Sequence, residues 1–232
     1  MKIDDAVSVA GWLVVALLGV VGIVWGAETF AKHLSVASVR LGVSSFALAL
    51  LLAGAEPEEL ATSVTASLRH APGIAFGDVI AANVAICLVA IGVGAIIAAL
   101  PFSTRVRRYA LAGLPVGAIA AVFAWDGSVS RLEGGVLVVA YAVIAVIWVI
   151  ERQVAAVVGS YAYNATMTLG AGALARPLVI LDAASLHLPW AVMLASLVAV
   201  VIAGASGRIT RNDGIALLAC YPVFVALVLV AA

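Results

Sequence analysis

The sequence predicts an all-α integral membrane protein, and two observations lead to that prediction. The chain of 232 residues is 66% hydrophobic and only 10% charged, far from the composition of a soluble domain. Apolar runs of about 20 residues, the length that crosses a bilayer core, recur along the whole chain. No polar domain or linker separates these runs, so we expect a single membrane-embedded unit.

Hydropathy places eight transmembrane helices along the chain. The first apolar run is too long for a signal peptide and lacks a basic flank and a cleavage site, so we expect it to remain as a helix. The second is expected to break near Pro57, because proline removes a backbone donor and interrupts the helix. Short connections that carry most of the charges separate the others. The expected ranges are 7–30, 39–68, 73–99, 106–124, 130–150, 153–175, 185–204 and 212–231.

Positive charges are divided unevenly between the two sides of this arrangement. With the N-terminus outside, eight of the 12 Lys and Arg residues are cytoplasmic and four are outside. Because cytoplasmic loops carry an excess of Lys and Arg, we expect both termini outside, in a prokaryotic plasma membrane. The cytoplasmic set is Lys32, Arg40, Arg105, Arg107, Arg108, Arg152, Arg208 and Arg211, and the outer set is Lys2, Arg69, Arg131 and Arg176.

The sequence also contains an internal repeat. Residues 130–141 recur as 210–221 with the shared pattern [ST]-R-x-[ED]-G, and Gly92 recurs as Gly170. The predicted helices 3–5 then correspond to helices 6–8 in the opposite orientation, and inverted repeats with a broken helix are typical of secondary transporters. Chance similarity between Ala-, Val- and Gly-rich helices is the alternative. We predict a first repeat of five helices, 1–151, and a partial inverted repeat of three helices, 152–232.

Three glutamates inside the second apolar run, Glu56, Glu58 and Glu59, form an acidic cluster. A carboxylate at membrane depth costs about 2.5 kcal/mol or more, so such a cluster indicates a functional site. Thr62 and Ser63 follow Glu59 by three and four residues and share its helical face. Their hydroxyl groups either complete an oxygen shell or bond back to the preceding turn. Glu56 shares this face as well, whereas Glu58 is expected to point elsewhere and reach water.

These segments resemble the calcium/cation antiporter superfamily, which includes the sodium/calcium exchangers. The sequence GAEPEELATS at 54–63 resembles the family's first signature, G-T-S-L-P-E-L-A-T-S, and residues 73–86 resemble its continuation, G-x-A-x-G-N-V-x-G-S-N-I. Residues 159–164, GSYAYN, resemble the second copy of the G-S-N-I-F-N helix, and the repeated S-R-x-E-G stretches resemble the fifth and tenth helices. The resemblance covers nearly the whole chain in order and implies two inverted five-helix repeats.

The chain departs from that family pattern in several places. Two helices have no counterpart between Glu151 and Val154, and they would have carried the second P-E-L glutamate. Glu56 stands where the family usually has Ser, Ala82 replaces the Ser of the G-S-N motif, and Tyr161 replaces its second Asn or Asp. The resemblance therefore implies a shortened exchanger fold with five plus three helices.

The resemblance also implies a cation site. Glu59 matches the cation-binding glutamate and Asn83 matches the Asn of the first repeat. Asp78 either caps the third helix, where a carboxylate suits the N-terminus, or lines the ion pathway, and Ser160 is a weaker candidate from the second copy. Carboxylate, hydroxyl and amide oxygens suit hard ions such as calcium or sodium. The candidate ligands are Glu59, Thr62, Ser63, Asn83 and Glu56, with Asp78 and Ser160 weaker, and no cofactor is expected.

We therefore expect secondary-active cation transport, of the sodium/calcium exchange type, by alternating access. The alternative is a divergent, non-transporting membrane subunit that binds ions or a partner. An enzyme is not expected, because the chain lacks a P-loop and a credible nucleophile and base pair. The two helices without a counterpart form a hairpin in the family. Without this hairpin, polar groups would face lipid, which is costly, or another protein. A parallel homodimer or a different membrane subunit is the expected partner besides lipid and inorganic cations, and no nucleic acid is expected.

Overall fold

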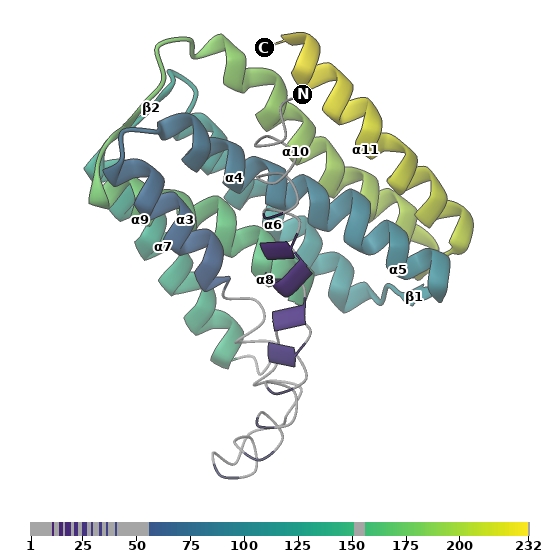
Figure 1. Cartoon of the computed structure of the whole chain (residues 1–232). Coiled ribbons are helices and arrows are strands. Elements are labelled where there is room, and N and C mark those ends of the chain that lie inside the picture. The colour runs from purple at the N-terminus through teal and green to yellow at the C-terminus, as the bar shows by residue number, and fades with distance from the viewer. Residues whose placement is uncertain are drawn as a thin grey trace. The chain divides into compact units, whose positions relative to one another are not determined.

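A computed structural model describes residues 56–150 and 156–231, together with scattered positions between residues 11 and 40. The chain divides into two compact units, Met1–Ala49 and Leu50–Ala232. In the first unit the described positions are helical, and the Thr29 hydroxyl donates a hydrogen bond to the Trp25 carbonyl over 2.8 Å. The second unit holds the candidate site (Figure 1). The predicted helix 39–68 is described only from residue 56 onward.

Helices make up almost all of the described second unit, and their bounds lie within a few residues of the predicted ones. Four stretches in the described part of the chain are long and apolar enough to span a membrane: Pro72–Ile97, Thr104–Phe123, Ala184–Ser206 and Arg211–Leu229. This confirms an all-α integral membrane fold. The helices are α3 (Pro57–Leu68), α4 (Pro72–Ala85), η1 (Ile86–Ala90), α5 (Ile91–Ile97), α6 (Thr104–Phe123), α7 (Arg131–Ile150), α8 (Ala156–Ala162), η2 (Tyr163–Thr168), α9 (Leu169–Ala175), α10 (Ala184–Ala203), η3 (Gly204–Ser206) and α11 (Arg211–Ala231).

Two π-helical turns interrupt helices that hydropathy predicts as continuous. The turn η1 lies between α4 and α5, and η2 lies between α8 and α9. Hydropathy does not reveal such a turn, because one extra residue leaves the apolar character of the span unchanged. π-Helical turns are frequent at functional sites, and η2 carries a residue of the candidate site.

Two short antiparallel ribbons join the connections at either end of the helices. β1 (Leu100–Pro101) pairs with β4 (Arg208–Ile209), and β2 (Ser128–Val129) pairs with β3 (Leu178–Val179). The offsets seen in the sequence relate β1 to β3 and β2 to β4, so one ribbon is the internal copy of the other. Strands of two residues have no readable period, and the sequence did not predict them.

The glycines of the repeat mark two equivalent helix crossings. A Cβ atom on Gly134 of α7 would lie 2.7 Å from the carbonyl oxygen of Gly170 in α9. In the same way, a Cβ atom on Gly214 of α11 would lie 2.6 Å from the carbonyl oxygen of Gly92 in α5. The offsets of the repeat relate Gly134 to Gly214 and Gly92 to Gly170, so the two crossings are equivalent and helix packing follows the repeat. The boundary near residue 151 lies outside the described residues and stays a prediction.

Close approach at the Gly134 crossing predicts a large difference between two adjacent alanine substitutions. Gly134→Ala places a Cβ against backbone atoms of α9, and overpacking of this kind costs about 1–3 kcal/mol. Gly135→Ala meets only a side-chain atom of Leu174 at 3.9 Å and gains helix propensity of about 1 kcal/mol. Thermal unfolding in detergent should therefore show a lower melting temperature for Gly134→Ala alone. Equal melting temperatures would contradict the crossing.

The acidic residues of the repeated [ST]-R-x-[ED]-G pattern cap helices. Ser130 donates to Glu133 Oε2 from its backbone nitrogen over 2.8 Å and from its hydroxyl over 2.7 Å, at the start of α7. Thr210 donates to Asp213 Oδ2 over 2.8 Å and 2.6 Å at the start of α11. Each pair forms a capping box, so these acids fix helix ends and take no part in the ion site.

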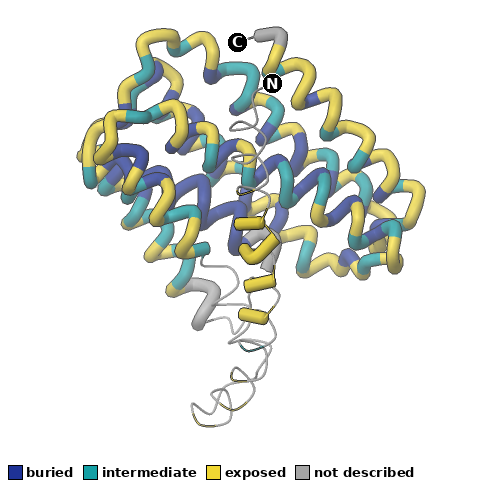
Figure 2. Tube along the Cα trace, viewed as in Figure 1, coloured by how far each residue is buried: buried dark blue, intermediate teal, exposed yellow. Residues whose placement is uncertain are grey.

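Six of the arginines described in the second unit form two groups that agree with the predicted sorting. Arg105, Arg107 and Arg108 begin α6 beside the β1–β4 ribbon, which also carries Arg208. Arg131 and Arg176 line one hollow near the β2–β3 ribbon. All six are exposed, and the buried positions lie along the inner faces of the helices (Figure 2). Which group faces the cytoplasm stays a prediction.

Candidate cation site

The acidic cluster lies where α3 begins. Pro57 is the first residue of α3, and Glu56 precedes it with a non-helical backbone (φ −89°, ψ 83°). Glu58 and Glu59 occupy the first turn, and no side chain caps the helix. The N-terminus of a helix carries partial positive charge and stabilises carboxylates. A helix therefore starts at Pro57, where negative charge is favoured, while the helix predicted before this break lies outside the described residues.

Glu56 is held by two side chains from the second repeat. Asn164 of η2 donates from Nδ2 to Glu56 Oε2 over 2.5 Å, and Ser160 of α8 forms a second side-chain hydrogen bond with Glu56. The Thr168 hydroxyl donates to Asn164 Oδ1 over 3.3 Å, which fixes the orientation of the amide. Asn164 and Thr168 are fully buried. These contacts join two segments that lie 108 residues apart in the sequence.

Glu59 faces a second carboxyl group. Its side chain is hydrogen-bonded to Asp78 of α4, which adjoins α3. Asp78 Oδ2 is buried and has no partner among the described residues. Two neighbouring carboxyl groups repel one another when both are ionised, and a cation between them would relieve that repulsion. Asp78 lies beyond the first turn of α4, where Ala71 is the N-cap residue, so the capping alternative is wrong.

The two hydroxyl groups next along α3 have different surroundings. Thr62 is exposed and donates to the carbonyl of Glu58 over 2.9 Å, which is the bond back to the preceding turn. Ser63 is fully buried, and its Oγ has no partner among the described residues. A Cβ on Gly172 would overlap Ser63 Oγ, so this hydroxyl lies directly against α9. Glu58 is exposed, as predicted.

Asn83 is buried at the interface between the repeats. Its Nδ2 donates to the carbonyl of Tyr161 over 3.4 Å and to Met193 Sδ over 3.5 Å. Tyr161 follows Asn83 by 78 residues, the offset of the repeat, so the two repeats meet here. Asn83 Oδ1 has no partner among the described residues. The hydrogen bonds of Asn83 to described residues reach none of the other candidate ligands, and its role as a ligand stays a proposal.

Residues 11–150 and 152–230 match the family described as sodium/calcium exchanger protein, which is nearly the whole chain. The chain belongs to this family. It is 37% identical over 94 residues to the sodium/calcium exchanger MaX1 of Methanosarcina acetivorans, in a match that covers 40% of this chain and 26% of MaX1. It is 30% identical over 129 residues to an uncharacterized membrane protein of Methanocaldococcus jannaschii, covering 56% of this chain and 40% of that protein. The matched segments thus span less than half of the length of each relative.

Solved structures of the sodium-calcium exchanger NCX_Mj have the same fold. One, soaked with 2.5 mM Na⁺ and 0.1 mM Ca²⁺, gives a TM-score of 0.75 at 19% identity and covers 90% of this chain and 96% of that one. Another, soaked without Na⁺ and Ca²⁺, gives a TM-score of 0.74 over the same share of each chain. The predicted exchanger fold is therefore confirmed. Sodium/calcium exchangers are transporters and not enzymes, which agrees with the prediction from the sequence.

Sequence reasoning ranked two residues of this exchanger-family site too low. Asn164 was noticed only as part of the G-S-N-I-F-N resemblance, and Ser160 was a weaker candidate, yet both bind Glu56. The signal was available, since polar side chains within membrane-spanning segments are expensive and mark functional positions. Glu56 stands where the family usually has Ser, and a local motif does not show what faces that position from another helix.

The candidate ligands of this member of the exchanger family are mixed rather than purely acidic. In residues 56–150 and 156–231, no three His, Cys, Asp or Glu side chains meet closely enough to hold a metal ion. The carboxylates instead come as a pair, Glu59 with Asp78, and as Glu56 with amide and hydroxyl partners. Calcium binds about six to eight oxygens from such groups. The described residues therefore place carboxylate, amide and hydroxyl oxygens close together near the start of α3.

Proposed function

We propose that this chain carries out secondary-active exchange of cations, with sodium and calcium as the substrate ions, by alternating access. Glu59 and Asp78 hold the ion from one side, and Glu56, Ser160 and Asn164 border it from the other. One observation supports this most strongly: the Glu56 carboxyl group, near Glu59 at the start of α3, bonds to Asn164 of η2 and Ser160 of α8. A broken helix at a repeat interface is where secondary transporters bind their ions.

The electrostatics of this arrangement favour a cation over an anion. Three carboxyl groups gather within an otherwise apolar bundle, and no Lys or Arg of the described residues forms an ion pair with them. Ser63 Oγ and Asp78 Oδ2 retain free lone pairs. An ion that enters between α3 and α4 would separate the Glu59 and Asp78 carboxyl groups, and its departure would let them share a proton again.

Ion flux into proteoliposomes that contain only this chain tests the proposal. An outward sodium gradient should drive ⁴⁵Ca²⁺ uptake, and collapse of that gradient with a sodium ionophore should stop it. Empty liposomes and liposomes holding heat-denatured protein provide the background. Calcium uptake equal to this background, in vesicles whose protein is folded and correctly inserted, would refute exchange by this chain alone.

A second candidate is a non-transporting membrane subunit that binds ions or a partner through α3 and α4. The incomplete oxygen shell favours this alternative, since calcium prefers more ligands than the described residues supply. Calcium binding without flux in the experiment above would favour it. Flux driven by a sodium gradient would exclude it.

The absence of a second helical hairpin predicts that the chain works with another polypeptide. Polar groups of α3 and α4 that lack a covering hairpin would face lipid, which is costly. We expect a parallel homodimer or a complex with a different membrane subunit, because the charge bias disfavours two opposite orientations. Mass measurement in mild detergent should give a species larger than one chain, and cysteines placed at the termini should be labelled from one side only. A monomer that exchanges ions would contradict this expectation.

A further inference from the structure

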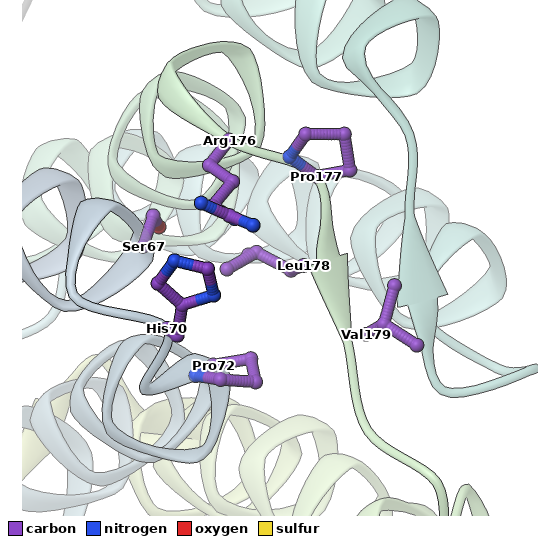
Figure 3. Close-up of a pocket in the computed structure, with 7 residues that line it drawn as sticks. All are labelled: Ser67, His70, Pro72, Arg176, Pro177, Leu178 and Val179. Carbon is purple, nitrogen blue, oxygen red and sulfur yellow. The ribbon is translucent and has the colours of Figure 1, made fainter.

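A hollow lies at the C-terminal end of α3, at the opposite end of this helix from the acidic cluster. It has a volume of about 420 Å³ and is formed by the α3–α4 turn and by the segment that leads from α9 into β3. Figure 3 shows the imidazole of His70 and the guanidinium of Arg176 turned toward one another across this space. Its remaining lining is Ser67, Pro72, Pro177, Leu178 and Val179. Two nitrogen donors thus face a hollow whose walls are mostly apolar.

The backbone at His70 shows that this side chain is retained at a cost. His70 has φ 60°, and among the described residues no other non-glycine has a positive φ. The His70 nitrogen donates to the Ser67 carbonyl over 3.2 Å, and the Ala71 nitrogen donates to the Ala66 carbonyl over 2.9 Å. These two bonds form a Schellman motif, in which glycine is the usual residue at the left-handed position. Residues kept in such conformations cluster at functional sites.

The donors in the hollow are free to bind a ligand. Arg176 and His70 are exposed, and neither side chain bonds to another described residue. No carboxylate lines the hollow, and Arg131 lines an adjacent hollow that shares Arg176 and Pro177. The positive end of α4 begins here as well, at Pro72. An arginine with free donors matches the geometry of a phosphate group.

We propose that this hollow binds the phosphate of a membrane lipid headgroup. The hollow lies where α3 and α9 end and α4 begins, and the ends of spanning helices lie at headgroup level. Val179 and the two prolines supply an apolar surface for the glycerol and the first acyl carbons. A lipid here bridges the ends of α3 and α9, the helices that lead from the acidic cluster and from η2. The proposal does not depend on exchange activity.

Lipid binding to the full chain in a neutral detergent tests the proposal. Native mass spectrometry and thermal unfolding would measure binding of phosphatidylglycerol, with monoolein as a lipid that lacks phosphate and inorganic phosphate as the free anion. Arg176→Gln should weaken phosphatidylglycerol binding about tenfold, the usual effect of losing a charge-assisted hydrogen bond. His70→Gly should weaken it as well, while its melting temperature without lipid stays equal or rises, because glycine relieves the left-handed backbone.

Arg208→Gln is the matched control, since Arg208 is an exposed arginine in the other ribbon. It should leave phosphatidylglycerol binding unchanged. Equal affinity in wild type, Arg176→Gln and His70→Gly would overturn the site, and equal affinity for monoolein would overturn the role of phosphate. Protection by inorganic phosphate alone, equal to that by the lipid, would assign the hollow to a free anion and overturn the lipid.

Discussion

Glu59→Gln is expected to abolish cation uptake in proteoliposomes while leaving the protein folded. Glutamine keeps the size of the side chain and one oxygen but removes the negative charge that a cation needs. It also ends the pairing of two carboxyl groups, because the amide can donate to Asp78. The loss of one close repulsion should keep the melting temperature equal to that of wild type or raise it. Flux and thermal unfolding of the same preparation measure both effects.

Glu58→Gln is the matched control for this substitution. Glu58 belongs to the same first turn of α3 but is exposed. Its substitution should reduce uptake only mildly. Wild-type uptake by well-folded Glu59→Gln protein would remove Glu59 from the site. Equal losses from both variants would instead indicate that the cluster acts as a general electrostatic attractant for cations.

Asn164→Leu is expected to destabilise the protein and stop transport together. Leucine has a similar volume but removes the donor to Glu56 and the acceptor for Thr168. A buried polar group left without its partner costs about 1–3 kcal/mol, and a charged one costs more. The Thr168 hydroxyl and the Glu56 carboxylate would both lose a bond. A melting temperature and an uptake rate equal to those of wild type would contradict the role of Asn164.

Asn164→Asp separates hydrogen bonding from ion binding at the same position. Its carboxylate retains the acceptor for Thr168 but faces Glu56 with like charge, so the variant should be unstable without divalent ions. If a cation binds between these residues, calcium should raise the melting temperature of Asn164→Asp more than that of wild type. Calcium should have no such effect on Asn164→Leu. Equal calcium responses in all three proteins would place the ion elsewhere.

The sequence by itself determined the class of the protein and the positions of its helices. Hydropathy along single segments is local information, and spans such as 73–99 and 106–124 agree with the observed helices to within a few residues. The proline at position 57 predicted an interruption of the helix there, and the cost of a charge within the membrane predicted a functional role for Glu59. The repeated glycines indicated the two equivalent crossings. Each of these features depends on residues that are close together in the chain or on a pattern visible within it.

Tertiary structure alone decided which polar groups meet. Glu56 and Asn164 are separated by 108 residues, and no local pattern could have paired them. Glu59 meets Asp78 because α3 packs on α4, and Thr62 turned out to bond within its own helix. The physical reason is that a partner across helices depends on how the helices cross, and α9 approaches α3 closely because Gly172 leaves room for Ser63. Hydropathy fixes which segments enter the membrane, whereas packing between them selects the groups that surround an ion.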